Sequence, residues 1–313
     1  MINNIIFFGL AALGLIISGT YLVKSLEKIS RFLRISEFTA AFIIMALATS
    51  VPELFVGISS AIQGNPNLSL GNIIGSNIID LTLISGIFVI LGRGIKLHAR
   101  KVPKDSFVML SSVILIAILY LIGNSISRID GVILLFAFAF NSYRIMKKRE
   151  RYGKVYKDKE ISRKSIIISS FIFVVALLIL FVSSRYAVKY AIQIAEDFVI
   201  PELFIGIFLL GVATTLPELV FGIRAVMMKH ESMSIGDQTG AVFVHLTLII
   251  GLVALISPIS IPLTTVLIPG IFMFLAAFIF TAFVQSGKEL DVREGLSLIF
   301  IYIAFIIIQF FVK

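Results

Sequence analysis

Two short segments place a carboxylate directly after a proline inside otherwise apolar sequence. The first is ATSVPELFVGI, residues 48–58, and the second is ATTLPELVFGI, residues 213–223. Because proline has no N–H and its ring crowds the carbonyl four residues back, each helix should kink there and free backbone oxygens. Hard cations such as Ca²⁺ and Na⁺ prefer sites made of carboxylate, hydroxyl and carbonyl oxygens. The chemistry that these segments predict is therefore cation binding.

The two turns carry the same kinds of oxygen ligand at the same places. A carboxylate at bilayer depth costs about 2.5–3.5 kcal/mol on insertion scales, so each glutamate is by default a functional residue. The alternative is an ordinary kink in which each glutamate pairs with a lysine or arginine. No basic residue lies in the predicted central parts of these spans, and the arrangement occurs twice, so we favour the functional interpretation. The candidate ligands in the two turns are Thr49, Ser50, Glu53, Thr214, Thr215 and Glu218.

A second polar position follows each motif at the same distance. Asp80 comes twenty-seven residues after Glu53, and His245 comes twenty-seven residues after Glu218. Ser76 lies one helical turn before Asp80, so the two side chains should face the same way. A lone histidine in an apolar run is commonly a packing residue, but this spacing leads us to expect that His245 lines the site. Histidine titrates near neutrality when unperturbed, which keeps a proton-linked step open.

The two motifs belong to a repeat that extends over much of the chain. A shift of 165 residues aligns 48–86 with 213–251, with fifteen identical positions that include the closing LTLI-x-G. Inverted repeats with interrupted helices at corresponding positions indicate a secondary transporter with its site near the membrane midplane. Glycines four residues apart recur in both halves and predict close helix packing rather than phosphate binding. They are Gly71, Gly75, Gly236 and Gly240.

The elements that must position these residues are membrane-spanning helices. The chain has 313 residues, of which 58% are hydrophobic and 14% are charged, and its mean hydropathy is +1.06. These values are far more apolar than those of soluble domains. A span needs about 20 mainly apolar residues, and the sequence predicts ten. They lie near residues 3–23, 37–62, 70–92, 106–123, 130–146, 165–191, 200–227, 236–257, 264–284 and 295–312.

The long polar segment KKRERYGKVYKDKEISRK, residues 147–164, divides the spans into two sets of five. It holds nine lysines and arginines, so the positive-inside rule places it in the cytoplasm and both termini outside. Because five is odd, the second set must enter the membrane upside down relative to the first. The predicted domains are a first five-helix repeat (1–146), a cytoplasmic basic linker (147–164) and a second, inverted five-helix repeat (165–313).

Composition also limits the partners. The formal charge of +9 does not indicate nucleic-acid binding, because the basic residues lie in short loops whose charge the membrane topology explains. The chain has no cysteine, so a cysteine-based metal site is excluded. The expected partners are the lipid bilayer and transported cations. The sequence leaves the oligomeric state open.

Taken together, these residues resemble the calcium/cation antiporter superfamily, whose two repeats carry a G-T-S-x-P-E core followed by G-N-x-x-G-S-N on the next helix. Here residues 71–77 read GNIIGSN. The resemblance covers essentially the whole chain and is closest to the prokaryotic sodium/calcium exchangers. It implies an all-α membrane protein of ten transmembrane helices in two inverted five-helix repeats, located in the cell membrane. The implied activity is exchange of Ca²⁺ for Na⁺ by alternating access, without an enzymatic reaction or a cofactor.

The resemblance also implies a ligand set. Glu53 and Glu218 would bind Ca²⁺ together with the backbone carbonyls of Thr49 and Thr214. The flanking monovalent-cation sites would use Ala46, Ser50, Ser76 and Asp80 in the first half, and Gly211, Thr215, Ala241 and His245 in the second.

The sequence departs from the family pattern in the second repeat, which reads GDQTGAV in place of GNIIGSN. Ala241 therefore offers no side-chain ligand where the first half has Ser76. A protonated His245 would repel a cation. The alternative within transport is a proton-driven exchanger of Ca²⁺ or another divalent cation. A gated cation channel and an intramembrane hydrolase are less compatible, since the repeats are inverted and no G-x-S-x-G or H-E-x-x-H motif occurs.

Overall fold

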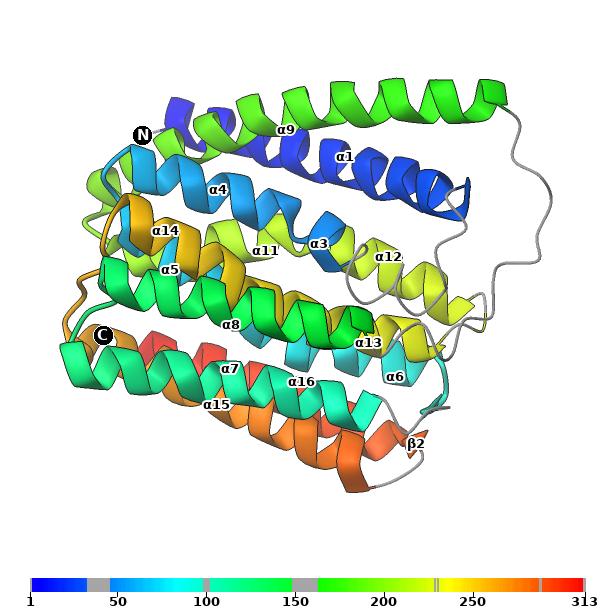
Figure 1. The fold of residues 1–313 in the computed structure, drawn as a ribbon. Coiled ribbons are helices and arrows are strands. Elements are labelled where there is room, and N and C mark those ends of the chain that lie inside the picture. Colours follow the sequence, from blue (N-terminus) through cyan, green and yellow to red (C-terminus); the bar gives the residue numbers. More distant parts are fainter. Residues whose placement is uncertain are drawn as a thin grey trace.

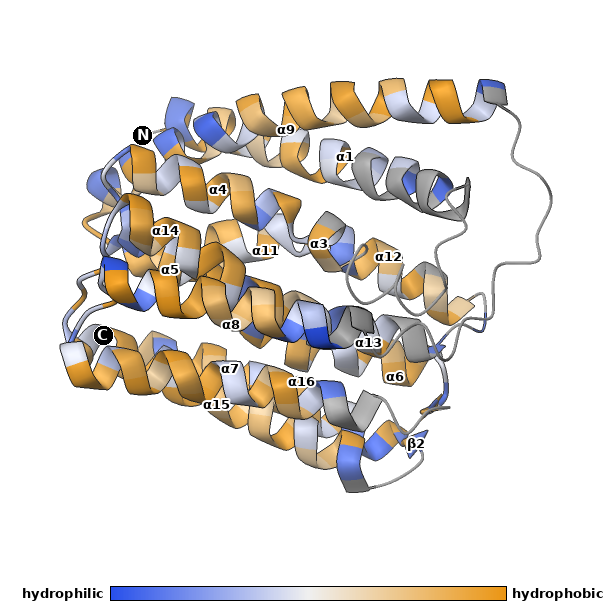
Figure 2. Ribbon diagram, in the orientation of Figure 1, coloured by the Kyte–Doolittle hydropathy of each residue, from blue (hydrophilic) through white to orange (hydrophobic). Residues whose placement is uncertain are grey.

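The structure is a computed structural model, and it describes residues 2–32, 46–97, 102–147, 163–227, 229, 231–286 and 289–311. Nearly all of these residues are helical, and the helices run along one common direction in a single bundle (Figure 1). Hydrophilic residues gather mainly near the two ends of the bundle, while most residues between the ends are apolar (Figure 2). Many large apolar side chains are exposed on the outside, as expected for a protein surrounded by lipid. The expected class of all-α membrane protein is confirmed.

The helices of the first half begin with α1 (Ile2–Phe32). They continue with α3 (Ala46–Thr49), α4 (Val51–Ile62), α5 (Pro66–Ile79), the π-helix η2 (Asp80–Ile84), α6 (Ser85–Leu91), α7 (Val102–Gly123) and α8 (Arg128–Lys147). The second half has α9 (Arg163–Phe198), α10 (Glu202–Ile205), the π-helix η4 (Gly206–Leu210), α11 (Gly211–Thr214), α12 (Leu216–Met227), α13 (Glu231–Val244), the π-helix η5 (His245–Ile249), α14 (Ile250–Ile256), α15 (Leu263–Ser286) and α16 (Val292–Phe311). The short strands β1 (Ile95–Lys96) and β2 (Glu289–Leu290) pair antiparallel at one end of the bundle.

Eight helical stretches of the described chain are long and apolar enough to cross a membrane. They account for eight of the ten predicted spans. Of the two predicted spans that remain, the one over 37–62 is represented by α4, and its residues up to 45 lie outside the described part of the chain. The other remaining span, predicted over 130–146, corresponds to α8. This helix carries charged and polar residues at its ends and is therefore less apolar than the eight stretches above.

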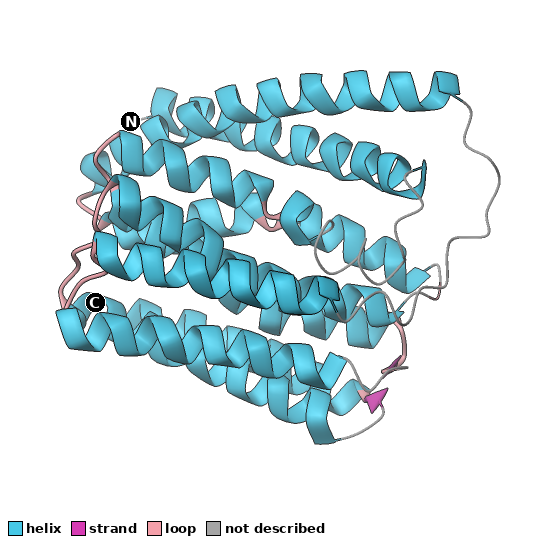
Figure 3. Cartoon of the chain, viewed as in Figure 1, coloured by secondary structure: helices cyan, strands magenta, loops and turns pink. Residues whose placement is uncertain are grey.

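Each proline motif interrupts its helix, as the sequence predicts. The first break separates α3 from α4 at Ser50, and the second separates α11 from α12 at Thr215. Pro52 and Pro217 occupy the first turn after each break, where the missing N–H costs no helical hydrogen bond. The break before α4 lies near the middle of the bundle (Figure 3). Each break therefore creates a helix N-terminus deep inside the protein.

The described helix boundaries repeat with the same 165-residue shift as the sequence. Helices α3, α4, α5, η2 and α6 begin 165 residues before α11, α12, α13, η5 and α14. The repeated LTLI forms most of a π-helix in both halves, starting at Asp80 in one and at His245 in the other. Single-turn π-helices occur preferentially at functional sites. The two halves thus share one local structure as well as one motif.

Glycines bring α5 close to the segment α10–η4–α11. A Cβ atom on Gly71 would lie 2.1 Å from the carbonyl oxygen of Leu203, and one on Gly75 would lie 2.4 Å from that of Ile207. The close packing predicted for Gly71 and Gly75 is confirmed. For Gly236 and Gly240, the segment related to α10 and η4 by the repeat falls within 37–45, which lies outside the described residues.

Helices α1 and α9 form a pair at the edge of the bundle (Figure 1). They approach closely where Gly14 faces Ser183, and only 17% of the apolar stretch of α9 is buried. Gly19 of α1 reaches both breaks, because a Cβ there would lie 2.9 Å from Pro217 Cγ and 3.3 Å from Pro52 Cγ. The outer pair is thus in contact with the two turns that carry the candidate ligands.

Candidate cation site

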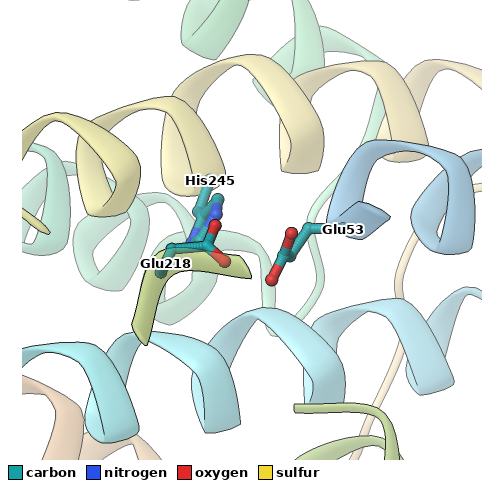
Figure 4. A group of neighbouring side chains, drawn as sticks. All are labelled: Glu53, Glu218 and His245. Atoms are coloured by element: carbon teal, nitrogen blue, oxygen red, sulfur yellow. The ribbon is translucent and has the colours of Figure 1, made fainter. Parts of the chain in front are cut away.

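Three of the predicted ligands meet in the centre of the bundle. Glu53 of α4, Glu218 of α12 and His245 of η5 are each fully buried. Each offers one ligand atom, and these atoms lie within 4.8 Å of one another. Figure 4 shows Glu53 facing Glu218 and His245 from the opposite side. We refer to Glu53, Glu218 and His245 as the central cluster.

The helix breaks help to stabilise the two buried glutamates. Each glutamate lies in the first turn of its helix, just after the break. A helix N-terminus carries a partial positive charge that stabilises a nearby anion. The two N-termini therefore favour carboxylates at a depth where no water is available to solvate them.

The carboxylates of the two central glutamates are not held by hydrogen bonds in the described part of the chain. Neither carboxylate oxygen of Glu53 or of Glu218 has a hydrogen-bond partner among the residues that the structure describes. Protein ligands lie about 2.0–2.6 Å from a bound divalent ion, so two ligands of one ion are at most about 4–5 Å apart. The separation within the central cluster is compatible with a single shared ion.

His245 is oriented by a neighbour on α5. Its Nδ1 lies 2.8 Å from Oδ1 of Asn77, and the Asn77 amide nitrogen points to the sulfur of Met273, 3.8 Å away. Because the amide oxygen can only accept a hydrogen bond, Nδ1 is the donor in this arrangement. The other ring nitrogen, Nε2, is buried and has no hydrogen-bond partner in the described chain. The neutral imidazole therefore keeps a lone pair available for a cation.

The threonine and serine hydroxyls surround the cluster. Thr214 Oγ1 lies 3.1 Å from Asn72 Oδ1 and 3.3 Å from Ser76 Oγ, which joins the second break to α5. Ser50 is buried, and its hydroxyl has no hydrogen-bond partner among the described residues. Thr215 Oγ1 instead donates to the Gly211 carbonyl, 2.9 Å away.

Ala46 and Gly211 offer backbone oxygens one turn before the breaks. The Ala46 carbonyl lies 3.3 Å from Thr49 Oγ1 and 3.1 Å from the Ser50 nitrogen. The Gly211 carbonyl accepts from both the hydroxyl and the N–H of Thr215. Ala241 is fully buried and contributes no polar side-chain atom.

Asp80 lies outside the central cluster but close to it. Its side chain is fully buried, and its Oδ2 atom has no hydrogen-bond partner in the part of the chain that is described. With the Gln238 amide oriented as a donor, its nitrogen lies 3.2 Å from Asp80 Oδ1 and 3.2 Å from the Asp80 carbonyl. The charge of Asp80 interacts with those of Glu53 and Asp237. Asp80 is thus the third buried acid of the site, held in place by an amide from the second half.

Asp237 is a fourth buried acid that the sequence analysis missed. It is fully buried, and neither of its carboxylate oxygens has a hydrogen-bond partner among the described residues. Thr49 lies next to it, and its charge interacts with that of Glu218. The 165-residue shift aligns Asp237 with Asn72, which contacts Thr214 in the same way. This alignment was the available signal, because an acid replaces an amide at a position that faces the opposite turn.

Comparison with known proteins gives consistent findings. A family model described as sodium/calcium exchanger protein matches residues 3–146 and 168–311. The chain is 25% identical over 348 residues to the sodium/calcium exchanger MaX1 of Methanosarcina acetivorans, with 99% of both chains covered. It is 29% identical over 224 residues to the inner membrane protein YrbG of Escherichia coli K12, which covers 69% of this chain and 68% of that protein.

Solved structures show the same fold. The chain superposes on a structure of the sodium-calcium exchanger NCX_Mj soaked with 10 mM Na⁺ and 10 mM Sr²⁺ with a TM-score of 0.71. The sequence identity is 23%, and the match covers 97% of this chain and 98% of that chain. This similarity shows that the helices of the two proteins are arranged alike.

Proposed function

The chain belongs to the sodium/calcium exchanger protein family, and from this premise we propose that it is an antiporter that exchanges Ca²⁺ for Na⁺ across a membrane. The activity is transport, as in the relatives named as exchangers, and it requires no chemical reaction. The observation that carries the proposal is the pair Glu53 and Glu218, fully buried and without hydrogen-bond partners in the described chain. Such a pair is stabilised by a bound cation.

In this proposal the divalent ion binds between the two breaks. Glu53 and Glu218 balance the charge of one Ca²⁺, which takes six to eight oxygen ligands at about 2.3–2.6 Å. The backbone carbonyls of Thr49 and Thr214 complete part of this shell, because each lies at a break where the helical hydrogen-bond pattern is interrupted. The breaks thus provide carbonyl ligands beside the two charges.

Counter-ions bind at positions that flank the divalent-ion site, and they compete with the divalent ion for the same acids. The acids available to them are Asp80 and Asp237, together with the two central glutamates when Ca²⁺ has left. The other proposed ligands of the flanking sites are Ala46, Ser50 and Ser76 in the first half and Gly211, Thr215, Ala241 and His245 in the second. Competition of this kind couples the two fluxes, since one ion must leave before the other is bound.

The empty carrier should cross between its two states slowly. Uncompensated buried charges cost several kcal/mol each, and the site holds four buried acids. Occupied forms are neutralised and move more readily. In this proposal, alternating access of the site therefore depends on ion binding to these charges.

The proposed topology has two inverted five-helix repeats, residues 1–146 and 165–313, joined by a cytoplasmic linker, residues 147–164. The two termini lie at the same end of the bundle, while α8 ends and α9 begins at the other end (Figure 1). This arrangement supports an even number of membrane crossings. The proposal that both termini lie outside the cell membrane rests on the nine basic residues of the linker and the positive-inside rule. The matching helix boundaries of the two halves support the repeat.

Proton-driven exchange of a divalent cation is the second candidate function. The observation in its favour is the unpartnered Nε2 atom of His245, which is able to take up a proton as well as a metal ion. Under sodium-driven exchange, His245→Asp should increase the dependence of divalent uptake on Na⁺. Unchanged sodium and pH profiles in this variant would remove His245 from the coupling mechanism.

The decisive experiment measures ⁴⁵Ca²⁺ uptake into proteoliposomes that contain Na⁺, K⁺ or an acidic buffer, with the membrane potential clamped. We expect saturable uptake that is driven by outward Na⁺ and not by K⁺. Uptake driven by the proton gradient alone would replace the sodium assignment with the second candidate. Uptake that neither gradient accelerates would contradict antiport.

A further inference from the structure

The central cluster contains a nitrogen ligand, although hard cations such as Ca²⁺ and Na⁺ prefer oxygen ligands. The Nε2 atom of His245 is buried, has no hydrogen-bond partner in the described chain, and shares the cluster with Glu53 and Glu218. Ca²⁺ is bound in proteins through oxygen atoms. Imidazole nitrogen suits zinc, iron, nickel and copper, while carboxylates suit manganese as well as calcium. A mixed nitrogen and oxygen ligand set is the usual chemistry of first-row transition metals.

The imidazole is held in the state that binds a metal. Asn77 accepts the Nδ1 proton at 2.8 Å and thereby fixes both the tautomer and the ring orientation. Metal-binding histidines commonly donate their second ring N–H to an oxygen in this way. The Asn77 amide is in turn held by Met273. The histidine therefore has the supporting contact of a metal ligand, which a residue that only fills space does not require.

The number and spacing of the ligands also fit an ion that is smaller than Ca²⁺, such as Zn²⁺. Catalytic zinc sites commonly use three protein ligands, among them histidines and carboxylates, and leave a fourth position open. The central cluster supplies three such residues with ligand atoms within 4.8 Å of one another. Metal–ligand distances of about 2.0–2.2 Å are reached by small movements of these side chains.

We propose that Glu53, Glu218 and His245 form a site that binds first-row divalent metals, from Mn²⁺ to Zn²⁺, more tightly than Ca²⁺. This inference rests on the proposed antiport only for the route by which such ions would cross. The binding preference itself follows from the ligand set of the cluster. His245 is the residue that determines the specificity, because it alone supplies nitrogen.

The test uses the purified full-length protein in detergent and Co²⁺ as the probe. Visible absorption of bound Co²⁺ reports its coordination, and competition with Ca²⁺ gives the ratio of the two dissociation constants. We expect Co²⁺ to bind at least about tenfold more tightly than Ca²⁺. In His245→Asn the preference should fall by at least about tenfold, with a changed Co²⁺ spectrum, because outer contacts alone are worth 10–100-fold in metal affinity.

Two further variants separate a ligand from a packing residue. Asn77→Leu removes the acceptor of the Nδ1 proton and should lower Co²⁺ affinity about 10–100-fold, whereas Asn77→Asp keeps an acceptor and should retain tight binding. The matched control is Thr247→Val on the same π-helix, whose hydroxyl contacts only the Phe243 carbonyl in the described hydrogen bonds. It should bind Co²⁺ and Ca²⁺ like the unmodified protein.

The outcomes distinguish this inference from the proposed function. Equal or weaker binding of Co²⁺ than of Ca²⁺, or a preference that His245→Asn leaves unchanged, overturns the inference even if Na⁺ drives Ca²⁺ uptake. Tight, His245-dependent Co²⁺ binding supports it even if no gradient drives ⁴⁵Ca²⁺ flux, a result that would reject the proposed function alone.

Discussion

At the scale of single residues, the site is defined by buried charge. Four acids are fully buried at the centre of the bundle, and the free oxygens of the two central glutamates face His245. Leaving a buried charge unpaired is expensive, while a cation that pairs with it recovers much of that cost. In the proposed antiport, the transported ion therefore also stabilises the site to which it binds. The four acids are Glu53, Asp80, Glu218 and Asp237.

Amide replacement of the central glutamates should separate transport from folding. Glu53→Gln and Glu218→Gln keep the side-chain size but remove a charge that has no described hydrogen bond to lose. Loss of one partner of a buried ion pair costs about 3–5 kcal/mol, which is more than about a hundredfold in affinity. We expect each variant to lose ⁴⁵Ca²⁺ flux and to remain folded by circular dichroism.

The control for these variants is Glu196→Gln, since Glu196 is exposed near the end of α9. It should transport normally. Full exchange activity in either central variant would show that the ion binds elsewhere.

Asp237→Asn tests the acid that the motif analysis overlooked. The aligned position in the first half is Asn72, so this variant has asparagine at the same position in both halves. Without cations, the variant should be more stable than the original protein by about 1–3 kcal/mol, because a buried charge is removed. The expected change is a higher thermal midpoint in sodium-free buffer and a smaller further increase on adding NaCl.

Choline chloride serves as the ionic-strength control for that measurement. A structural role for Asp237 predicts the opposite result, namely a lower midpoint in every buffer. That outcome would exclude Asp237 as a cation ligand.

At the scale of elements, glycines and helix breaks position the site. The breaks at Ser50 and Thr215 place two helix N-termini in the interior. Glycines on α5 then allow the backbone of η4 and its neighbours to approach. Through this contact Thr214 reaches Asn72 and Ser76. The ligands of the second half therefore depend on the packing of α5.

Gly75→Ala should disturb this packing. The added Cβ would lie 2.4 Å from the Ile207 carbonyl oxygen, a backbone atom that is unable to rotate away. Overpacking of this kind costs about 1–3 kcal/mol. We expect a lower thermal midpoint and reduced exchange. Gly9→Ala is the matched control, since no atom lies within 4 Å of the new Cβ; it should be neutral or slightly stabilising. Equal stability of the two variants would contradict the close approach.

At the scale of the whole molecule, the bundle presents apolar sides and two polar ends (Figure 2). Charge is distributed unevenly along the sequence, with nine basic residues in the segment 147–164. The positive-inside rule sets the orientation from this asymmetry. Both termini of the bundle lie at the end opposite the start of α9 (Figure 1).

The absence of cysteine makes this orientation easy to measure. Single cysteines introduced at Asn3, Ser125 and Lys154 are each labelled with a membrane-impermeant maleimide in intact cells. We expect labelling at Asn3→Cys and Ser125→Cys, and protection at Lys154→Cys until the membrane is permeabilised. The reverse pattern would invert the topology, and labelling at only one of the first two positions would require an odd number of crossings between them.

The sequence by itself determined the class of protein, the repeat and most of the candidate ligands. The backbone of an apolar run of about 20 residues satisfies its hydrogen bonds in lipid by forming a helix. A proline next to a charged residue in such a run marks the place where the helix breaks. These signals are local, so they are visible without a structure. The structure brings together three of the predicted residues, Glu53, Glu218 and His245.

Only the tertiary structure decided which polar atoms lie close together and which form hydrogen bonds with neighbours. The π-helices at Asp80 and His245 add one residue to a turn and leave no mark in the hydrophobic periodicity. The burial of Asp237 and the contact of Gln238 with Asp80 depend on α13 packing against the first half. The free Nε2 of His245 depends on Asn77, 168 residues away. Contacts between distant segments are set by packing of the whole bundle, which no local pattern specifies.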